Sequence, residues 1–524
     1  MLFESIARHC CSVFHFFDPS YLIAMDDSIS VGFHTILLFA VTFLLVLTAV
    51  RQYRRRPKNL PPGPWGLPII GSLLSLGTNP HLTFLEMTKT YGKVFRMNLA
   101  GQRVVVVNGF EAVREALVKN ASAFAGRPKM ALFHELTEGQ GIVTSDYGPV
   151  WREQRRFTLQ TLRNFGFGKR SFETKITEEI HHMLAAFREK GSEAFQADHI
   201  LEISASNVVS SLNFGRRFDY KDPQFQLLVD MIYRFSEIGT NAAAANFFPF
   251  LIKLPLPNIR EMFHISDIIE SFLMGIINQH KETYDPKAKR DFIDAYLGEI
   301  ARRQQESPSD DATSASFTEK YLYHILNDLI FAGTETMSST LRWALLYMIV
   351  FPDVQEKIQA ELDSVLEKDQ LPSIEDRQKL PYTEATLMEV QRMANITALP
   401  YPHKTTEDTE LCGFSIPKDT PIYINLYSVH IDPTQWVEPE KFRPERFLGE
   451  NGKVQNRPAL MPFSAGRRAC PGENLAKMEL FLFFSSMLHA FKISAAPENP
   501  QPSIEKHYGI SLNPSPFKIC TTPR

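Results

Sequence analysis

The longest uninterrupted apolar run of the chain lies near its N-terminus. Residues 31–50 read VGFHTILLFAVTFLLVLTAV and contain no Asp, Glu, Lys or Arg. As a helix, this run would span about 30 Å, the thickness of the hydrocarbon core of a bilayer. A cleaved signal peptide has a shorter apolar core and a small-residue cleavage site, and the run shows neither feature. It therefore predicts a transmembrane helix that anchors the chain.

The charged residues beside this run predict its orientation. A basic block follows it and acidic residues precede it: Arg51, Arg54, Arg55, Arg56 and Lys58 on one side, Asp18, Asp26 and Asp27 on the other. Positive charge gathers on the cytosolic side of membrane spans. We therefore expect a single-pass anchor, with residues 1–30 as a lumenal extension and everything after residue 50 in the cytosol.

Beyond the anchor, the pattern changes twice. Residues 51–66 combine the basic block with most of the sequence NLPPGPWGLP, whose prolines fix φ and remove backbone donors, so we expect a semi-rigid linker. From about residue 83, helical spacing of apolar positions dominates, with β-like runs at residues 103–107, at 411–425 and near the C-terminus. These patterns predict a mainly α fold with a smaller β portion, in one globular domain over residues 67–524.

One predicted helix is long enough to cross that domain. It starts after a polar Ser/Asp-rich loop, where Ser316 and Glu319 fit a capping box, and it can continue to Phe351, just before Pro352. Its length would be roughly 50 Å.

A second distinctive segment, residues 246–258, reads NFFPFLIKLPLPN. Its prolines exclude a regular helix throughout. Two interpretations remain open. The segment is either a second membrane contact near a substrate entrance or an apolar loop packed against the core.

The composition excludes some classes of protein. Lys and Arg total 56 against 59 Asp and Glu, and this balance gives no overall electrostatic reason to expect nucleic-acid binding. The five cysteines are odd in number and widely scattered, which does not fit a disulfide framework in a chain of 524 residues. We therefore expect the globular domain to lie in a reducing compartment.

The strongest chemical signal is the sequence FSAGRRACPG at residues 463–472, which leads directly into an amphipathic helical pattern. This pattern places Cys470 at a helix N-terminus, with Pro471 at the first helical position. The helix dipole and unpaired N–H groups there lower the pKa of a thiol and favour the thiolate, the form that binds metal. A lone cysteine is by default an inert buried residue, but this sequence setting favours a metal ligand.

The same stretch resembles the haem-binding signature of the cytochrome P450 superfamily. The matching positions are Phe463, Gly466, Arg468, Cys470 and Gly472. Other family motifs follow in the expected order: AGTET at residues 332–336, Glu-x-x-Arg at Glu389 and Arg392, and PERF at residues 444–447. The anchor and the PPGP linker resemble the microsomal members, and segments such as RDFIDAYL and LRWALLYM are similar to vertebrate family 2, with the J subfamily most similar.

This resemblance implies the cytochrome P450 fold and a haem b whose iron takes its axial thiolate from Cys470. It implies a proton relay by Thr336 and Glu335, beside Ala332 and Gly333, where the missing side chain of glycine lets backbone approach the cofactor. The alternative for Thr336 is a hydrogen bond to its own helix.

The resemblance also implies residues that hold the rest of the haem. The family pattern WxxxR maps onto Trp151 and Arg155, which lie one helical turn apart. Together with Arg127, His403 and Arg468 they are expected to bind the two propionates, and Phe463 and Gly472 complete the haem contacts. Glu389 and Arg392 share one helix face and are expected to pair, with Arg446 as a third member of a structural cluster.

The resemblance implies partners and a location as well. Because no dinucleotide fingerprint follows a strand, electrons from NADPH must arrive through another protein. We expect NADPH-cytochrome P450 reductase, with cytochrome b5 as a second candidate, docking on the basic segment after Trp151. That segment contains Arg152, Arg155, Arg156, Arg163, Lys169 and Arg170; a solvated helix face is the plainer interpretation. We expect the anchor to contact the lipid of the endoplasmic reticulum membrane and the catalytic domain to lie in the cytosol.

Similarity to the J subfamily favours a monooxygenase of the unspecific type that epoxidises or hydroxylates polyunsaturated fatty acids such as arachidonate. The expected pocket segments are mostly apolar or small, and they lie at residues 130–141, near Asn241, at Phe331 and Ala332, at 398–402 and near Ile510. Broad oxidation of lipophilic foreign compounds is the main alternative. A reductase-independent isomerase and a gas sensor fit less well, since neither needs a proton-relay threonine.

Overall fold

Two units make up the chain, Met1–Leu60 and Pro61–Arg524. The computed structural model describes residues 39–40, 42–43, 59–168, 170–240, 242–306 and 315–524. The predicted lumenal extension therefore lies outside the described residues, as do most of the predicted anchor and the basic block. Within the described part of the chain, no helix combines the length and the apolar character needed to cross a membrane. The fold that positions the site is formed by Pro61–Arg524.

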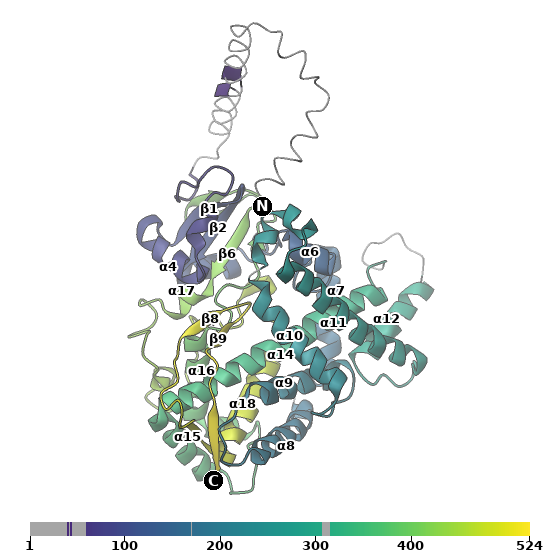
Figure 1. Ribbon diagram of the computed structural model, residues 1–524, viewed down its shortest axis with the longest axis vertical. Coiled ribbons are helices and arrows are strands. Elements are labelled where there is room, and N and C mark those ends of the chain that lie inside the picture. Colours follow the sequence, from purple (N-terminus) through teal and green to yellow (C-terminus); the bar gives the residue numbers. More distant parts are fainter. Residues whose placement is uncertain (1–38, 41, 44–58, 169, 241, 307–314) are drawn as a thin grey trace, which may run out of the picture. The chain divides into compact units, whose positions relative to one another are not determined.

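Helices make up most of this unit, as the sequence predicts (Figure 1). Proline begins α4, α7, α10, α11, α15 and α16, because its fixed φ and missing N–H suit the first helical position. The helices are α4 (Pro80–Tyr91), α5 (Phe110–Arg114), α6 (Ala131–Thr137), α7 (Pro149–Asn164), α8 (Glu173–Glu189), α9 (Asp198–Asn213), α10 (Pro223–Gly239), α11 (Pro257–Glu282), α12 (Phe292–Glu306), α14 (Glu319–Val350), α15 (Pro352–Val365), α16 (Pro381–Ala394), α17 (Leu426–His430) and α18 (Glu473–Ala490).

Strands form a smaller part of the unit. A four-stranded sheet has the order β1-β2-β6-β3, in which β2 and β6 are parallel and the other neighbours antiparallel. The run of valines in β2 is buried, as expected for a central strand. The strands are β1 (Val94–Leu99), β2 (Gln102–Asn108), β3 (His403–Lys404), β4 (Thr409–Leu411), β5 (Phe414–Ile416), β6 (Pro421–Asn425), β7 (Phe491–Ala495), β8 (Lys506–Tyr508), β9 (Leu512–Pro514) and β10 (Ile519–Pro523). The pairs β4–β5, β7–β10 and β8–β9 are separate antiparallel hairpins or ribbons.

The predicted long helix is α14, which has 32 residues and a length of about 48 Å. It ends one residue before the predicted stop, and Pro352 begins α15. Its N-cap is Thr318, whose hydroxyl accepts a hydrogen bond from the N–H of Tyr321, so the predicted capping box at Ser316 is wrong. Most of its later turns are buried, because α14 packs against α9, α11, α16 and α18 (Figure 1).

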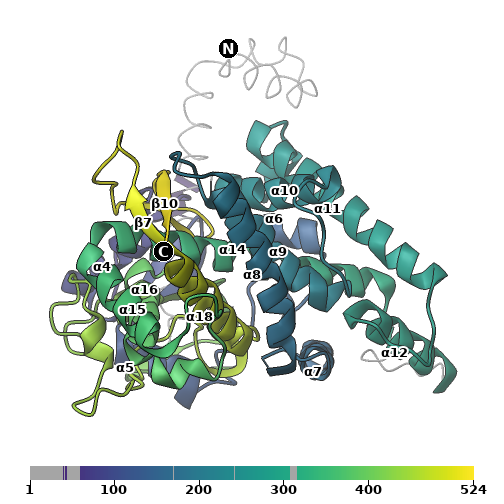
Figure 2. The same ribbon diagram turned by 90° about the horizontal axis from the view of Figure 1, so that it is seen from below.

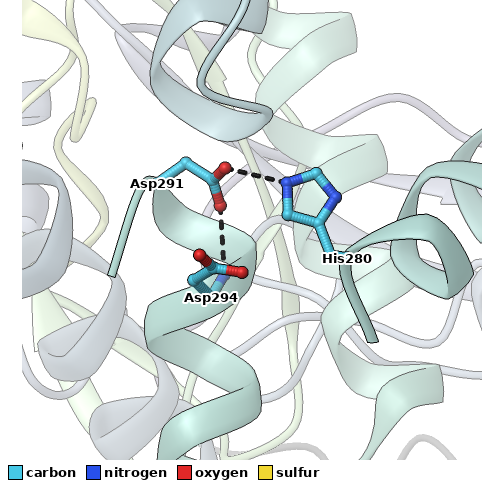
Figure 3. Close-up of side chains that lie close together, drawn as sticks. All are labelled: His280, Asp291 and Asp294. Carbon is cyan, nitrogen blue, oxygen red and sulfur yellow. Dashed lines mark hydrogen bonds and ion pairs between the residues drawn. The ribbon is translucent and has the colours of Figure 1, made fainter. Parts of the chain in front are cut away.

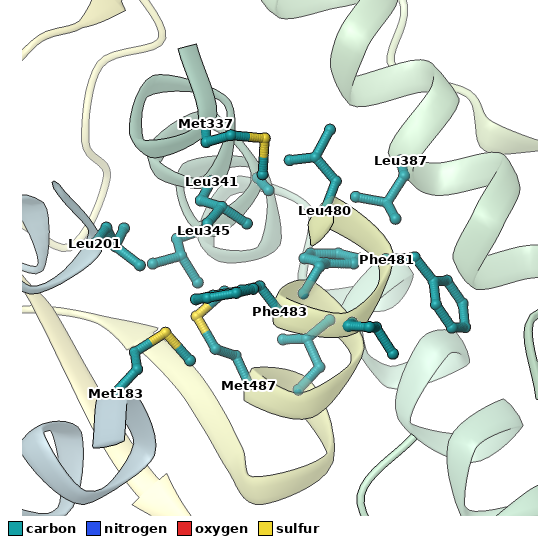
Figure 4. Packing of buried hydrophobic residues seen from close by; sticks show 14 of the residues in the cluster. Met183, Leu201, Met337, Leu341, Leu345, Leu387, Leu480, Phe481, Phe483 and Met487 are labelled. Carbon is teal, nitrogen blue, oxygen red and sulfur yellow. The ribbon is translucent and has the colours of Figure 1, made fainter. Parts of the chain in front are cut away.

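The packing of α14 against α18 forms the centre of the hydrophobic core. Met337, Leu341 and Leu345 of α14 face Phe483 and Met487 of α18, with side chains of α8, α9 and α16 around them (Figure 4). Figure 2 shows α18 beside α8 and α16. Since α18 follows the cysteine motif and α14 carries residues 332–336, this core fixes two distant sequence motifs relative to each other.

Helices α11 and α12 are joined by a polar junction of His280, Asp291 and Asp294 (Figure 3). Asp291 accepts from His280 Nε2 at 2.8 Å and from the backbone N–H of Asp294 at 3.0 Å, so it caps α12. Asp294 is bound by the guanidinium of Arg290, and His280 Nδ1 lies 2.9 Å from the carbonyl of Ile276. Because these donors and acceptors already have protein partners, the cluster is a structural junction.

The proline-broken segment at residues 246–258 contains two short 3-10 helices, η4 (Ala243–Asn246) and η5 (Pro249–Lys253), before α11 starts. Phe247 packs against the cluster of Phe84 and Phe95, whereas Phe250 is 62% exposed and Leu254 is 44% exposed. Part of the segment is therefore packed on the core, as one interpretation expects, and part faces outward, where the membrane-contact interpretation stays a prediction.

A fully buried cluster of charges fixes the chain that leads towards Cys470. Glu389 of α16 accepts hydrogen bonds from Nε and Nη2 of Arg392, each at 2.8 Å, and from Nε of Arg446 at 3.1 Å. The remaining guanidinium hydrogens reach backbone carbonyls between residues 430 and 441. The structure thus brings together the three residues that the sequence predicts as a structural cluster, and it ties α16 to the segment that precedes the cysteine motif.

We expect Glu389→Ala to lower the free energy of unfolding by about 3–5 kcal/mol, because it leaves two buried guanidinium groups without their shared carboxylate. Urea denaturation of the full chain measures this change. The control is Glu86→Ala, which removes the exposed partner of Lys89 and should change stability by less than about 1 kcal/mol. Equal losses in the two variants would contradict the proposed importance of burial.

Candidate functional site

The loop before α18 holds Cys470 in a defined position. The N–H of Cys470 donates to the carbonyl of Phe463 at 2.9 Å, which closes the loop over the turn η8 (Gly466–Arg468). Gly466 has a φ of +75°, and a Cβ there would lie 1.8 Å from the carbonyl oxygen of Leu117. Only glycine fits this close approach, so the motif glycine presses the cysteine loop against the π-helical turn η2 (Glu115–Lys119).

Helix α18 starts later than the sequence predicts. Its N-cap is Gly472 and its first residue is Glu473, so Pro471 does not occupy the first helical position. The N–H groups of Gly472 and Glu473 and the charge of Arg155 lower the pKa of the Cys470 thiol. Cys470 is accessible to solvent, but desolvation by the surrounding protein raises its pKa by more than these N–H groups and Arg155 lower it. The predicted lowering of the thiol pKa is therefore wrong for the protein alone.

Residues 332–336 form an accessible stretch in the middle of α14. Ala332 is exposed and Thr336 half-buried, whereas Thr334 and Glu335 are buried. The hydroxyl of Thr336 donates to the carbonyl of Ala332 at 2.7 Å, which is the helix back-bond named as the alternative to a relay. Gly333 also lies against a neighbouring helix. A Cβ there would meet Val209 of α9 at 2.3 Å, so the missing side chain lets α9 and α14 pack closely.

The side chain of Glu335 bonds residues of α10 and of the C-terminal segment around β9. Its carboxylate accepts from Ser236 of α10 at 3.2 Å, from Asn513 of β9 at 3.4 Å, and from Ser511. Burial raises the pKa of Glu335, and these hydrogen bonds offset part of the effect. Sequence reasoning missed Ser236, Ser511 and Asn513, because nothing local to them marks a partner for a residue more than 90 positions away.

Three guanidinium groups and Trp151 meet near the cysteine loop. Arg468 lies 3.9 Å from the centre of the Trp151 ring and donates to the carbonyls of Ala125, Ile142 and Ser145. Arg127 donates to the carbonyls of Val143, Tyr401 and Pro402. Arg155 lies 5.4 Å from the same ring and donates to the carbonyl of Ala469, the residue before Cys470, at 2.5 Å. The structure therefore assembles the predicted propionate ligands beside the predicted iron ligand.

This cation cluster, defined as Arg127, Arg155 and Arg468, carries excess positive charge. Burial lowers the pKa of Arg468 to about 8 and that of Arg127 to about 10, and each guanidinium repels another. In the described part of the chain, their side chains hydrogen-bond to backbone carbonyls, and the nearby carboxylate of Asp146 pairs with Lys404 at 2.6 Å. An anionic group would therefore be stabilised here.

The predicted residue His403 is also buried beside the cluster. Its Nδ1 lies 2.7 Å from the carbonyl of Phe124. Burial, followed by the charge of Arg127, lowers its pKa well below the usual value, so it is neutral and leaves Nε2 for a further hydrogen bond.

Asp328 of α14 is a site residue that sequence reasoning missed. Its carboxylate accepts the N–H groups of Ile142 at 2.6 Å and Val143 at 3.0 Å, and burial raises its pKa to about 6. The carbonyls of the same two residues accept from Arg468 and Arg127. An aspartate within the apolar run LNDLIF is the signal that could have identified it.

The basic segment after Trp151 is less uniform than its sequence. Arg155 belongs to the cation cluster, Arg156 pairs with Glu153, and Arg170 pairs with Glu375; Lys169 lies outside the described residues. A hollow of about 530 Å³ lies behind the cysteine loop, between α16, α18 and residues 454–465. Four basic side chains line this hollow. Arg377 and Lys477 pair with Glu384 and Glu473, which line it as well, and the other two are Arg114 and Arg457.

Comparison with known proteins agrees with this arrangement. The family model described as Cytochrome P450 matches residues 61–521. Cytochrome P450 2J2 of Homo sapiens is 40% identical over 494 residues, covering 94% of this chain and 96% of that protein. Cytochrome P450 2J5 of Mus musculus is 41% identical with the same coverage, and Cytochrome P450 2U1 of Homo sapiens is 39% identical over 90% of each chain. With its cysteine loop, cation cluster and long central helix, the chain belongs to the cytochrome P450 family.

Proposed function

We propose that Cys470 is the axial thiolate ligand of a haem iron, and that the chain inserts one oxygen atom of O₂ into lipophilic substrates. Members of the family bind haem through a cysteine thiolate and receive electrons from NADPH through a reductase. The observation that carries the assignment to these residues is the contact of Arg155 with Ala469, which places excess buried positive charge next to the cysteine loop.

The donor set fits haem b. Haem has two carboxylates at one edge, and Arg127, Arg155 and Arg468 offer guanidinium hydrogens to such groups. His403 and the ring of Trp151 complete this edge, with Phe463 and Gly472 lying in the loop of Cys470. When bound by these residues, haem would supply the activation of dioxygen.

The protein's own residues then control protons and water. We infer that Ala332 and Thr336 form the accessible face of α14 that the reaction uses, with the Thr336 hydroxyl able to exchange its back-bond for another acceptor. Glu335 lies behind this face, and burial raises the pKa of its carboxyl. Its bonds to Ser236 and Ser511 keep the carboxyl away from bulk water.

For the substrate, we propose polyunsaturated fatty acids such as arachidonate, oxidised to epoxides or hydroxylated acids. Support comes from the resemblance to the J subfamily and from the apolar character of the expected pocket segments. Ile510, in one of these segments, lies close to Gly239 of α10: a Cβ built at Gly239 would lie 3.1 Å from Cδ1 of Ile510. The loop between β8 and β9 therefore packs against α10.

We also propose the predicted domain arrangement: residues 1–30 lumenal, 31–50 an anchor in the endoplasmic reticulum membrane, 51–66 a linker, and 67–524 a cytosolic catalytic domain. The apolar residues Trp65, Ile69, Leu74, Phe250 and Leu254 are exposed, and Phe247 and Leu73 pack on the same small cluster. These residues support a second membrane contact. NADPH-cytochrome P450 reductase is the proposed electron donor and cytochrome b5 a second one, with the basic residues behind the cysteine loop as support for docking.

The full chain, expressed in membranes with the reductase and given arachidonate, should form oxidised products only with NADPH. Cys470→Ala should abolish both the products and the thiolate-type carbonyl spectrum of the reduced protein, because no other described cysteine lies in the loop. Cys412→Ala is the matched control, since Cys412 is an exposed thiol, and it should retain both. A normal carbonyl spectrum without fatty-acid products would contradict arachidonate as the substrate and point to other lipophilic compounds. A Cys470→Ala variant that keeps the thiolate-type spectrum would refute Cys470 as the iron ligand.

Arg468→Ala should release haem at least about tenfold faster than the unmodified protein, because a charge-assisted hydrogen bond contributes about 1.5–3 kcal/mol. Transfer of haem to an excess of apo-globin measures this rate. The adjacent, exposed Arg467 supplies the control, since Arg467→Ala removes an equal charge outside the cation cluster. Similar release rates for the two variants would contradict a propionate role for Arg468.

A further inference from the structure

Two contacts define how α9 lies against α14. Asp198, at the start of α9, pairs with Arg342 of α14 at 3.0 Å. Further along α9, Val209 packs on Gly333 of α14. Because the numbers rise along α9 while they fall along α14, the two helices run antiparallel. In this register, Ser206 is level with Thr334 and Glu335, and Glu202 is level with Ser338 and Ser339.

Beside the apolar side chains of α9 that pack on α14, such as Leu201 and Ala205, one stripe of α9 is polar over several turns. Glu202, Ser206, Val209 and Asn213 recur at intervals of three or four residues and therefore share one face, with Ser210 beside it. All of them are buried, and Ser206 and Ser210 are fully inaccessible. A helix interface at the centre of the domain would normally be apolar, so this polar stripe requires an explanation.

Several polar atoms along this interface have no protein partner. They are Oγ of Ser206 and Ser210, Nδ2 of Asn213 and Oγ1 of Thr334 on α14. Buried polar groups in native proteins are almost always hydrogen-bonded, and ordered water serves where protein atoms do not. Each unsatisfied group would otherwise cost about 1–3 kcal/mol. These four atoms are therefore polar positions along the interface at which ordered water can bind.

Glu202 is buried on the same stripe and lies within the electrostatic reach of charged groups on three helices. Arg342 and Glu335 face it from α14, Asp198 from α9, and Asp230 and Tyr233 from α10. Asp230 is exposed and lies 3.7 Å from His199, also at the surface. Glu202 thus stands between surface carboxylates and the buried Glu335.

We propose that this polar seam, formed by Glu202, Ser206 and Ser210 of α9 and Thr334 of α14, conducts protons from solvent near Asp198 and Asp230 to Glu335. The inference rests on the proposed monooxygenase function and deepens it. Each turnover converts substrate, O₂, NADPH and one H⁺ into hydroxylated or epoxidised product, NADP⁺ and water. The oxygen atom reduced to water takes two protons, and the seam supplies them. The Glu202 carboxyl passes its proton through water towards the Glu335 carboxylate and regains one from solvent.

The acid strength of Glu202 suits this task. Burial raises its pKa to about 8, with Arg342 acting in the opposite direction and the neighbouring carboxylates adding to the rise. The group is therefore protonated at neutral pH and can donate.

The test compares full-chain holoenzymes with the reductase, NADPH and arachidonate. Glu202→Gln keeps the shape of the side chain and removes its transferable proton. We expect about tenfold to hundredfold slower product formation, more peroxide released per NADPH, and a larger solvent deuterium isotope effect than in the unmodified enzyme. Glu202→Asp should restore part of the rate, since it restores the acid. A Glu202→Gln variant with the normal rate, peroxide yield and isotope effect would overturn the seam.

A pair of neighbouring serines provides a matched control that does not alter charge. Ser206 faces the seam, whereas Ser204 points to the other side of α9, where it bonds the hydroxyl of Tyr220 at 2.6 Å. Ser206→Ala should enlarge the solvent isotope effect and Ser204→Ala should not, even if the latter lowers thermal stability. Equal isotope effects in the Ser206→Ala and Ser204→Ala variants would refute the seam. This comparison tests the seam even if Glu202→Gln fails to fold. If the unmodified enzyme has the thiolate spectrum but forms no product from any lipophilic substrate tested, the monooxygenase proposal itself fails.

Discussion

The packing of α18 on α14 is the contact on which the site depends. Cys470 lies just before α18, and residues 332–336 lie in the middle of α14, so neither motif has a defined position without the apolar core between the helices. Close-packed side chains such as Met337 and Phe483 allow little adjustment of one helix against the other. The distance between the proposed iron ligand and the proposed oxygen-activating face consequently depends on this hydrophobic packing together with the polar contacts of the cysteine loop.

Two groups of buried charges surround this core, and they differ in balance. Around Glu389, the arginines share a carboxylate and use their remaining hydrogens on backbone carbonyls, so this cluster is satisfied by the protein itself. The cation cluster has carbonyl partners but retains excess positive charge. A ligand that supplies negative charge there binds the folded state selectively and stabilises it. The first cluster therefore maintains the fold, and under the proposed function the second couples the fold to its cofactor.

Sequence patterns predicted those features whose cause is local. The length of α14 followed from periodicity and Pro352, and the pairing of Glu389 with Arg392 followed from helical spacing. Strand β1 was missed although its sequence carries the signal, since the apolar residues Phe95, Met97 and Leu99 alternate with Arg96 and Asn98. Features set by distant contacts could not be predicted. Gly333 packs on Val209, Glu335 bonds Ser236 and Ser511, and Asp328 binds the backbone of residues 142–143.

The carbonyl contacts of Arg468 also have a consequence for the order of folding. Ala125, Ile142 and Ser145 are separated from Arg468 by 343, 326 and 323 residues in sequence. Closing such long loops carries a large entropic cost, and contacts of this kind form late on a folding pathway. During synthesis, the first half of the chain is complete long before Arg468 leaves the ribosome. The cation cluster is therefore complete only after the C-terminal fifth of the protein has been made and packed against the first half of the chain.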